Sequence, residues 1–312
     1  MTSGARNHHY IPQAYLRGFT EGGSKKSSFV VYEVDTGKRF ETKPRNVGAE
    51  RDFNRVNLPG FDPNVVESEM GKFEGLIPNA IEDIDKRNVF DGESRNTILN
   101  LIATLSTRHP DRREALRRFH AQIAEVAMSM VMAKPESYNH ACSQLKVPNR
   151  ESSVAHVPYE QMRRFVDGGE YVIDVATEHH LRMEATAHEA ALECLGQRKW
   201  MLYRTVTNHF ITSDFPVSLA WRSPGKIPAF YRSSPGHAMR DTEVVFPLNK
   251  HLALIGTFDG EDSTKQASPV VVGAFNLQAV RNARRHVYST KRDFLAVDAQ
   301  HNIISGARIF KG

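Results

Sequence analysis

The stretch NHHYIPQAYLRGF, residues 7–19, concentrates side chains that can do chemistry. His8 and His9 can transfer protons, and His9 can also bind a metal, because neutral imidazole does both near pH 7. Neighbours in an extended segment point to opposite sides, so we expect at most one histidine to face a pocket. Arg17 can hold a phosphate or carboxylate, while Tyr10 and Gln13 can hydrogen-bond a substrate. The alternative is a structural segment that docks through its apolar residues.

A second candidate lies in the stretch TSDFPV, residues 212–217. Asp214 stands between a predicted strand and Pro216, and such breaks present side chains to solvent or to a cleft. Its carboxylate is therefore a candidate metal ligand, alongside His9, or a candidate general base. The alternative is an Asx-turn, in which Asp214 bonds its own backbone before the proline.

Three glutamates lie on a helix predicted to begin near Asp62. Glu67 and Glu74 are two turns apart and share one face. Glu69 lies beside the apolar stripe, so we expect it to be partly buried and catalytic. A buried carboxylate needs a partner, which Arg17 or Arg108 can supply. The alternative is a solvated helix face.

A later predicted helix carries His180, Glu184 and His188 at i, i+4 and i+8, which is close to metal-ligand spacing. It lacks the His-Glu-x-x-His pattern of metalloproteases, and a polar outer face is the alternative.

Basic residues form two further clusters that can follow a phosphate backbone. The alternative for the clusters is a solvated face, except that Arg108 follows an apolar run and can form a buried ion pair. Their members are Arg108, Arg112, Arg113, Arg117 and Arg118, and Arg281, Arg284 and Arg285.

These residues need elements to position them, and the pattern predicts an α+β fold in one domain of 312 residues. We expect an N-terminal segment and β-hairpin over 1–60, a helical region over 61–196, and a mainly antiparallel sheet over 197–312. The hairpin turns at 35–37, and Pro78 breaks the first helical region. Residues 44–54 are expected to be irregular, and a late helix is expected over 276–289.

Composition narrows the classes of function. The formal charge of +5 permits a nucleic-acid or nucleotide partner without requiring one. Two cysteines provide no disulfide framework, and no leader or membrane-spanning stretch is visible, so we expect a cytoplasmic protein. The phosphate loop, the dinucleotide-binding glycine motif and the nucleophile elbow are all missing from the sequence.

Several stretches in order resemble a widespread bacterial family of unknown function: HHYIPQAYLRGF, PRNVGAERDF, ESEMGKFEGLIP, TLSTRHPDRRE, FITSDFPV and FNLQAVRNARRHVYS. The resemblance covers nearly the whole chain and implies a single family domain, but it implies no activity. Members commonly carry Ser-Asp-Asn-Pro where this chain has Ser-Asp-Phe-Pro. Phe215 thus replaces an asparagine, which cannot be essential here.

Three functions remain open from the sequence. The first is a phosphodiesterase or nuclease dependent on a divalent metal such as Mg²⁺ or Mn²⁺, with a defence or toxin role. The second is a nucleotide or polyanion sensor without turnover, and the third is a structural or partner-binding protein. For the first we expect one cleft to contain His8 or His9, Arg17, Glu69, Arg108 and Asp214.

Overall fold

The computed structural model describes residues 6–56, 59–60, 62–144, 157–233 and 235–310. These residues form two compact units, which are described separately. The larger unit contains the described residues up to His109 and those from Leu181 onward, and the smaller one runs from Pro110 to His180. The α+β class predicted from the sequence is confirmed, with an N-terminal hairpin, helices in the middle and sheets toward the C-terminus.

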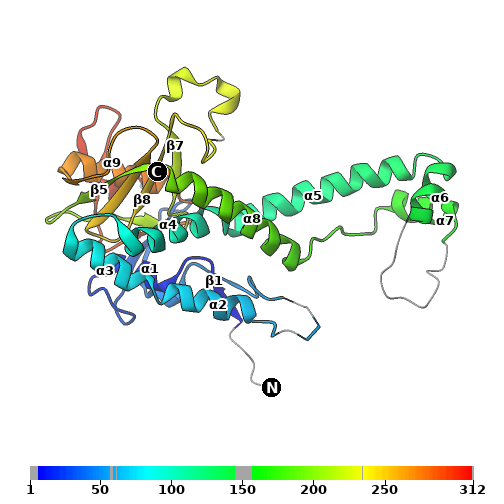
Figure 1. Cartoon of the computed structure of the whole chain (residues 1–312), viewed down its shortest axis with the longest axis horizontal. Helices are drawn as coiled ribbons and strands as arrows, with labels where there is room; N and C mark the ends of the chain where they lie inside the picture. The colour runs from blue at the N-terminus through cyan, green and yellow to red at the C-terminus, as the bar shows by residue number, and fades with distance from the viewer. Residues whose placement is uncertain (1–5, 57–58, 61, 145–156, 234, 311–312) are drawn as a thin grey trace. The chain divides into compact units, whose positions relative to one another are not determined.

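The larger unit contains two principal sheets (Figure 1). A five-stranded sheet has the order β10-β5-β9-β8-β7, and its strands are antiparallel except for the β10–β5 pair. A four-stranded antiparallel sheet has the order β3-β2-β11-β6. The strands are β5 (Lys199–Arg204), β7 (Ser218–Trp221), β8 (Thr242–Pro247), β9 (Leu252–Thr257), β10 (Ser263–Gln266), β2 (Phe29–Glu33), β3 (Arg39–Thr42), β6 (Thr212–Ser213) and β11 (His286–Ser289).

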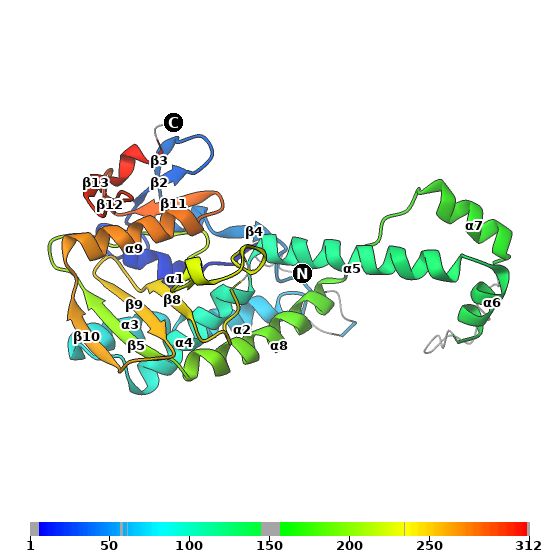
Figure 2. The same ribbon diagram turned by 90° about the horizontal axis from the view of Figure 1, so that it is seen from above.

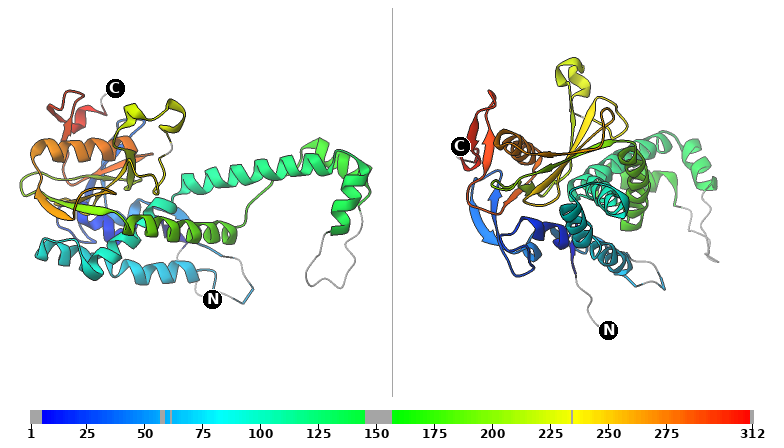
Figure 3. Two further views of the ribbon diagram at one scale, coloured as in Figure 1. Left: turned by 45° about the horizontal axis from the view of Figure 1, so that its top comes forward. Right: turned by 60° about the vertical axis from the view of Figure 1, so that its left-hand side comes forward.

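Helix α9 (Pro269–Asn282) packs between these two sheets (Figures 2 and 3). Its N-terminal half contributes Val272 and Phe275 to a cluster on one face of the five-stranded sheet. Its C-terminal half contributes Ala279 and Val280 to the four-stranded sheet. Contact with apolar surface on two sides explains why this helix holds several β-branched residues, since burial overrides local propensity.

The other face of the five-stranded sheet is covered by helices α3 (Ile77–Arg87) and α4 (Gly92–Thr107). Alternation along the strands separates the two faces: Leu252 and Leu254 of β9 join the core under these helices, and Ala253 joins the cluster under α9. Helix α2 (Val65–Glu74) precedes α3, and Pro78 lies in the first turn of α3. The predicted break at Pro78 is thus confirmed.

Two predictions about elements are wrong. The late helix begins at Pro269, not at Asn276, because Ser268 accepts a hydrogen bond from the backbone N–H of Val271 as an N-cap. It ends at Asn282, so His286–Ser289 is strand β11 and not helix. The segment 44–54 is not wholly irregular, because it contains β4 (Ala49–Arg51), which pairs with β1 (Asn7–His9). Strands of three residues are too short for periodicity to reveal.

The remaining elements of the larger unit are short, apart from α8 (Thr177–Gly196), which begins in the smaller one. The hairpin β12 (Leu295–Val297) and β13 (Ile303–Ser305) packs beside α9. Near the N-terminus, α1 (Gln13–Leu16) continues into a 3₁₀ turn, Arg17–Phe19. Other 3₁₀ turns are Pro44–Asn46, Pro224–Lys226, Ala229–Tyr231 and Gly306–Arg308.

The smaller unit contains α5 (Pro110–Val131), α6 (Pro135–Gln144) and α7 (Tyr159–Gly168). Its core contains Met132, Tyr138 and Tyr159. The two buried tyrosines donate hydrogen bonds to main-chain carbonyls, Tyr138 to Val157 at 2.7 Å and Tyr159 to Met132 at 2.9 Å. Aromatic rings with satisfied hydroxyl groups therefore join these three helices.

Candidate functional site

The N-terminal motif is packed into the protein and is not a loose tail. Strand β1 pairs with β4, so that His8 lies opposite Glu50, and the His8 side chain is fully buried. Farther along, the Tyr15 hydroxyl bonds Thr212 and donates to the Pro247 carbonyl, both at 2.8 Å. The motif is thereby fixed to strands more than 190 residues away in the sequence.

Asn54 connects three of the charged or polar side chains around the motif. Its backbone N–H donates to His8 Nδ1 at 2.9 Å, and its side-chain amide donates to Glu67 Oε2 at 2.6 Å. Arg108 Nη2 donates to Asn54 Oδ1 at 2.6 Å. Arg108 Nε also lies 3.7 Å from Glu184 Oε2, and both side chains are buried. We call His8, Asn54, Glu67, Arg108 and Glu184 the Asn54 network.

His8 is enclosed by the protein. Its side chain is fully buried, and its Nδ1 accepts the hydrogen bond from the Asn54 backbone N–H. His8 therefore holds Asn54 in place and does not meet a substrate directly.

Glu74 adds a second carboxyl on the same helix face as Glu67, as the spacing predicts. Burial raises the pKa of Glu74 to about 7, the negative charge of Glu67 raises it further, and Arg108 acts in the opposite direction. Glu74 accepts no hydrogen bond from the described residues. The two carboxyls thus form an incompletely neutralised pair, in which one is about half protonated at pH 7.

His9 and Gln13 lie on the other side of the motif. Gln13 Nε2 is 3.5 Å from His9 Nδ1. Burial lowers the pKa of His9, while the Arg45 backbone and Glu67 raise it in part. His9 is therefore neutral at pH 7, in the form that accepts a proton or binds a metal.

Arg17 follows Gln13 by four residues, which places both on one face of consecutive helical turns. The Arg17 guanidinium makes no hydrogen bond or ion pair with the described part of the chain, and its Nε is buried. An arginine in that state favours an anionic ligand, because its donors have no partner in the protein.

A cavity of about 320 Å³ lies between α2, α4 and α8 next to the Asn54 network. Its apolar wall comes from Val66, Met70, Phe73, Leu181 and Ala185, and its polar wall from Asn100, Thr104, Thr107, Arg108, Glu184 and His188. Burial lowers the pKa of His188, so this imidazole is also neutral at pH 7. The mixture of an apolar wall and a few polar groups is typical of small-molecule sites.

Aromatic contacts connect the motif to the TSDFPV stretch. The Tyr10 ring lies 5.3 Å from the His109 ring, and His109 lies 4.8 Å from Phe215, both edge to face. The Arg284 guanidinium lies 5.3 Å from the centre of the Phe215 ring. Phe215, where the family resemblance leads us to expect asparagine, thus has a packing role.

Asp214, a predicted base and metal ligand, is only 1 % exposed. Its Oδ1 accepts from the N–H of Arg284 at 2.8 Å, and its Oδ2 from those of Arg285 at 2.7 Å and His286 at 3.2 Å. Burial raises the pKa of Asp214, and these three bonds oppose the shift. The carboxylate fixes the connection between α9 and β11, and these bonds are separate from the Asn54 network. The Asx-turn predicted as its alternative is wrong, because the Asp214 oxygens accept from residues 284–286. The neighbouring Ser213 makes an ST-turn, in which its Oγ accepts from the Phe215 N–H at 3.2 Å.

Glu69 does not lie where the sequence led us to expect it. Its side chain is 62 % exposed and pairs with Lys72 at 2.7 Å, so the predicted burial beside Arg17 or Arg108 is wrong. Glu67 and Glu74 are the partly buried carboxyls of α2 instead. Of the expected cleft, the structure brings together His8, His9 and Arg108, with Glu67 and Glu74 in the place of Glu69.

The His180–Glu184–His188 set is only partly at the cavity. Glu184 and His188 line it, and His180 is not among its lining residues. In the smaller unit Glu114 pairs with Arg117 and with Arg118, each at 2.8 Å, which neutralises part of the basic stripe. Among the described residues, no three His, Cys, Asp or Glu side chains lie close enough to hold a metal on their own.

Asn54 was missed because nothing in its sequence context distinguishes it from a loop residue. The available signal was its place directly after PRNVGAERDF, one of the stretches in which the resemblance was seen. The hydrogen bonds of Asn54 become visible only when the segments that carry His8, Glu67 and Arg108 are placed around it.

A comparison with protein families identifies the chain as a member of DUF4238, a family described as protein of unknown function, whose model matches residues 7–293. The family resemblance noted in the sequence is thereby confirmed. No curated protein and no solved structure matches the chain. No helix among the described residues is both long and apolar enough to cross a membrane.

Proposed function

We propose that this member of the family is a phosphodiesterase of the nuclease type, with its reaction centre at Glu67 and Glu74 beside the Asn54 network. The observation that carries the proposal is the pair itself: two carboxyls on one face of α2, only one of them hydrogen-bonded by Asn54, next to a buried arginine. Like charges held this close are costly unless a proton or a cation lies between them.

A divalent cation, Mg²⁺ or Mn²⁺, is the occupant that fits this pair. Magnesium is commonly held by one or two carboxylates together with substrate phosphates, so a site of three protein ligands is not required. Glu67 has one oxygen outside its bond to Asn54, and Glu74 has both. When bound, such an ion polarises the phosphoryl group.

The surrounding residues then have distinct roles. His9, neutral at pH 7, accepts a proton from the attacking water, whose oxygen forms the new bond to phosphorus as the ester oxygen leaves. Arg17 holds a non-bridging phosphate oxygen, because its guanidinium has no partner among the described residues. Arg108 and Asn54 position Glu67. We propose that this chemistry takes place in the cytoplasm, in line with two free cysteines.

The test is hydrolysis of bis(p-nitrophenyl) phosphate and of a single-stranded oligonucleotide with Mg²⁺ or Mn²⁺. We expect Glu67→Gln and Glu74→Gln each to lower kcat by about 100-fold or more, which is the typical effect of losing such a group. Arg17→Ala should act mainly on KM. Glu69→Gln is the matched control on the same helix and should stay within about twofold of wild type, because Glu69 is exposed and paired with Lys72.

The other outcomes separate the alternatives. Nucleotide binding that needs Arg17 and Arg108 but gives no turnover would replace the enzyme by a nucleotide or polyanion sensor, with the cavity as its binding site. Equal activity in Glu67→Gln, Glu74→Gln and Glu69→Gln would contradict the proposal. If Glu67→Gln and Glu74→Gln both fail to fold, and the wild type binds neither metal nor nucleotide, the protein has a structural or partner-binding role instead.

A further inference from the structure

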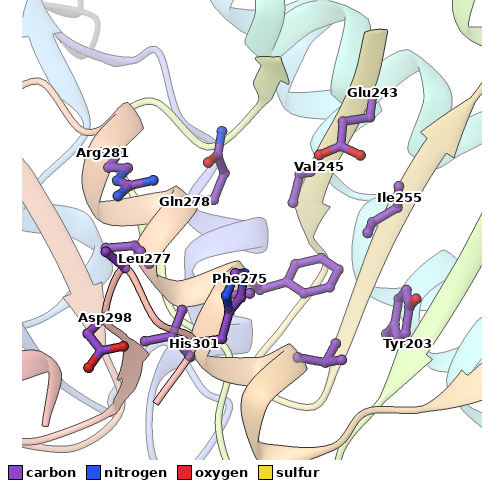
Figure 4. A pocket seen from close by; sticks show the side chains of 14 residues that line it. Tyr203, Glu243, Val245, Ile255, Phe275, Leu277, Gln278, Arg281, Asp298 and His301 are labelled. Carbon is purple, nitrogen blue, oxygen red and sulfur yellow. The ribbon is translucent and has the colours of Figure 1, made fainter. Parts of the chain in front are cut away.

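A second cavity, which shares no lining residue with the first, lies between the five-stranded sheet, α9 and the β12–β13 hairpin. Its volume is about 490 Å³, which is in the range of small-molecule sites. Figure 4 shows the side chains that line it. Tyr203, Glu243 and Ile255 come from three adjacent strands, and Phe275 comes from α9.

Glu243 is the unusual residue of this cavity. Its carboxylate is partly buried and accepts no hydrogen bond from any described residue. Burial raises the pKa of Glu243, as expected for a carboxyl without a close partner. The positive charge of Arg222 lowers the pKa of Glu243 in part, but Arg222 Nη1 donates to Asp259 at 3.2 Å and not to Glu243. Figure 4 shows the carboxylate directed into the cavity.

The surroundings of Glu243 favour one class of partner. Burial raises the pKa of Tyr203, and the negative charge of Glu243 raises it further. The Tyr203 hydroxyl makes no hydrogen bond with the described residues. The Tyr203 ring also stacks edge to face on Phe275, with centroids 5.4 Å apart. Val245 and Ile255 extend the apolar floor. A carboxylate, a phenol and aromatic faces together suit an ammonium group on an apolar body.

We propose that this cavity is a second binding site, which takes a small organic amine. The protonated amine lies against Glu243 and Tyr203, and the apolar body of the ligand covers Val245, Ile255 and Phe275. This inference does not depend on the phosphodiesterase proposal, because none of these residues belongs to the Asn54 network.

The opposite wall restricts the rest of the ligand. Arg281 lies across the cavity from Glu243 in Figure 4 and has no hydrogen bond or ion pair with the described residues. The Asp298 carboxylate is already used, because it accepts from the N–H of Gln300 and of Asn302, both at 2.9 Å. The far end of the ligand is therefore neutral or anionic, and a second cationic group is disfavoured there.

Three probes of one size test the charge requirement: 2-phenylethylamine, the neutral 2-phenylethanol and the anionic 3-phenylpropanoate. Calorimetric titration into the full chain should give measurable binding of the amine and at least about tenfold weaker binding of the other two. Glu243→Gln should remove this preference, because it keeps the shape of the side chain and loses its charge. Glu261→Gln, an exposed acidic position outside the cavity, is the matched control and should bind like wild type.

A second variant guards against effects on folding. Ala274 is exposed and lines the cavity, so Ala274→Trp should obstruct the site with little change in stability. Loss of amine binding in both Ala274→Trp and Glu243→Gln would support the proposal. No binding of the amine to wild type, equal binding of the three probes, or unchanged binding in Glu243→Gln would overturn it. Hydrolytic activity does not enter into this test, so the two proposals can fail separately.

Discussion

Glu74 lies between two charges of opposite sign, Glu67 on its own helix and Arg108 at the end of α4. Its pKa near 7 results mainly from burial, which removes water from the carboxylate. A carboxyl in this state exchanges its proton at the pH at which enzymes work, and it gains most from an incoming cation. The same burial makes the ionised side chain costly when no cation is present.

We therefore expect Glu74→Gln to be more stable than wild type at high pH. The folded-state pKa is above the unfolded value of 4.5, so raising the pH through the interval from about 4.5 to 7 destabilises the wild type and not the amide. The difference in the free energy of unfolding between Glu74→Gln and the wild type should grow across that interval. Above it the difference should stay constant, at no more than about 3 kcal/mol. Urea unfolding at pH 4, 6 and 8 measures it. A difference independent of pH would show that Glu74 titrates normally.

Side-chain types and spacing predicted that the N-terminal motif is packed into the protein and that Arg108 is buried, because polar groups near apolar runs need partners. They did not predict which glutamates of α2 face inward. Only the packing of α2 decides this, and it leaves Glu69 exposed. Sequence spacing predicted the shared face of Glu67 and Glu74 but wrongly assigned burial to Glu69.

At the scale of elements, the connection between α9 and β11 shows how a polar residue can be structural. Asp214 accepts hydrogen bonds from three consecutive N–H groups in the connection that follows the C-terminal end of α9. Next to it, Asn282 Nδ2 donates to the Val217 carbonyl at 2.9 Å and also to the Phe215 carbonyl. Both contacts fasten the TSDFPV stretch to the same connection.

Asp214→Ala should therefore lower the free energy of unfolding by about 3 kcal/mol, since buried donors lose a charged acceptor. Metal binding per folded molecule should not change, because Asp214 lies outside the Glu67–Glu74 pair. Chemical denaturation and calorimetry on the same preparation measure the two quantities. Asp35→Ala, at an exposed turn, is the matched control for stability. An Asp214→Ala variant that is as stable as wild type but no longer binds Mn²⁺ would contradict this account and show that Asp214 is a metal ligand.

Most elements were predictable because their periodicity is strong, as in the 29–42 hairpin and the helices of 77–107. The errors fall where burial or pairing with a distant segment outweighs local pattern. Val271 and Val272 favour a strand locally, yet they lie in the first turn of α9 because they pack in the cluster under the five-stranded sheet. Strand β4 exists because the N-terminal motif pairs with it.

At the scale of the whole molecule, residues from both ends of the sequence build the larger unit. Strand β11 lies between β2 and β6, and the motif binds β6 and β8 through Tyr15. The family match from 7 to 293 includes both of these regions. The contacts that hold the N-terminal motif are therefore also contacts that hold the larger unit together, which explains why the motif is buried.

The most direct test of the proposed centre is proton release on binding of Mn²⁺. A cation at Glu67 and Glu74 must displace the proton that Glu74 holds near its pKa of about 7. Isothermal titration at pH 6, in buffers of different ionisation enthalpy, should therefore show release of close to one proton per ion bound, and much less at pH 8. Glu69→Gln should behave like wild type, and Glu74→Gln should bind weakly without release. Binding that releases no proton at pH 6, or release that persists in Glu74→Gln, would contradict a metal site at this carboxylate pair.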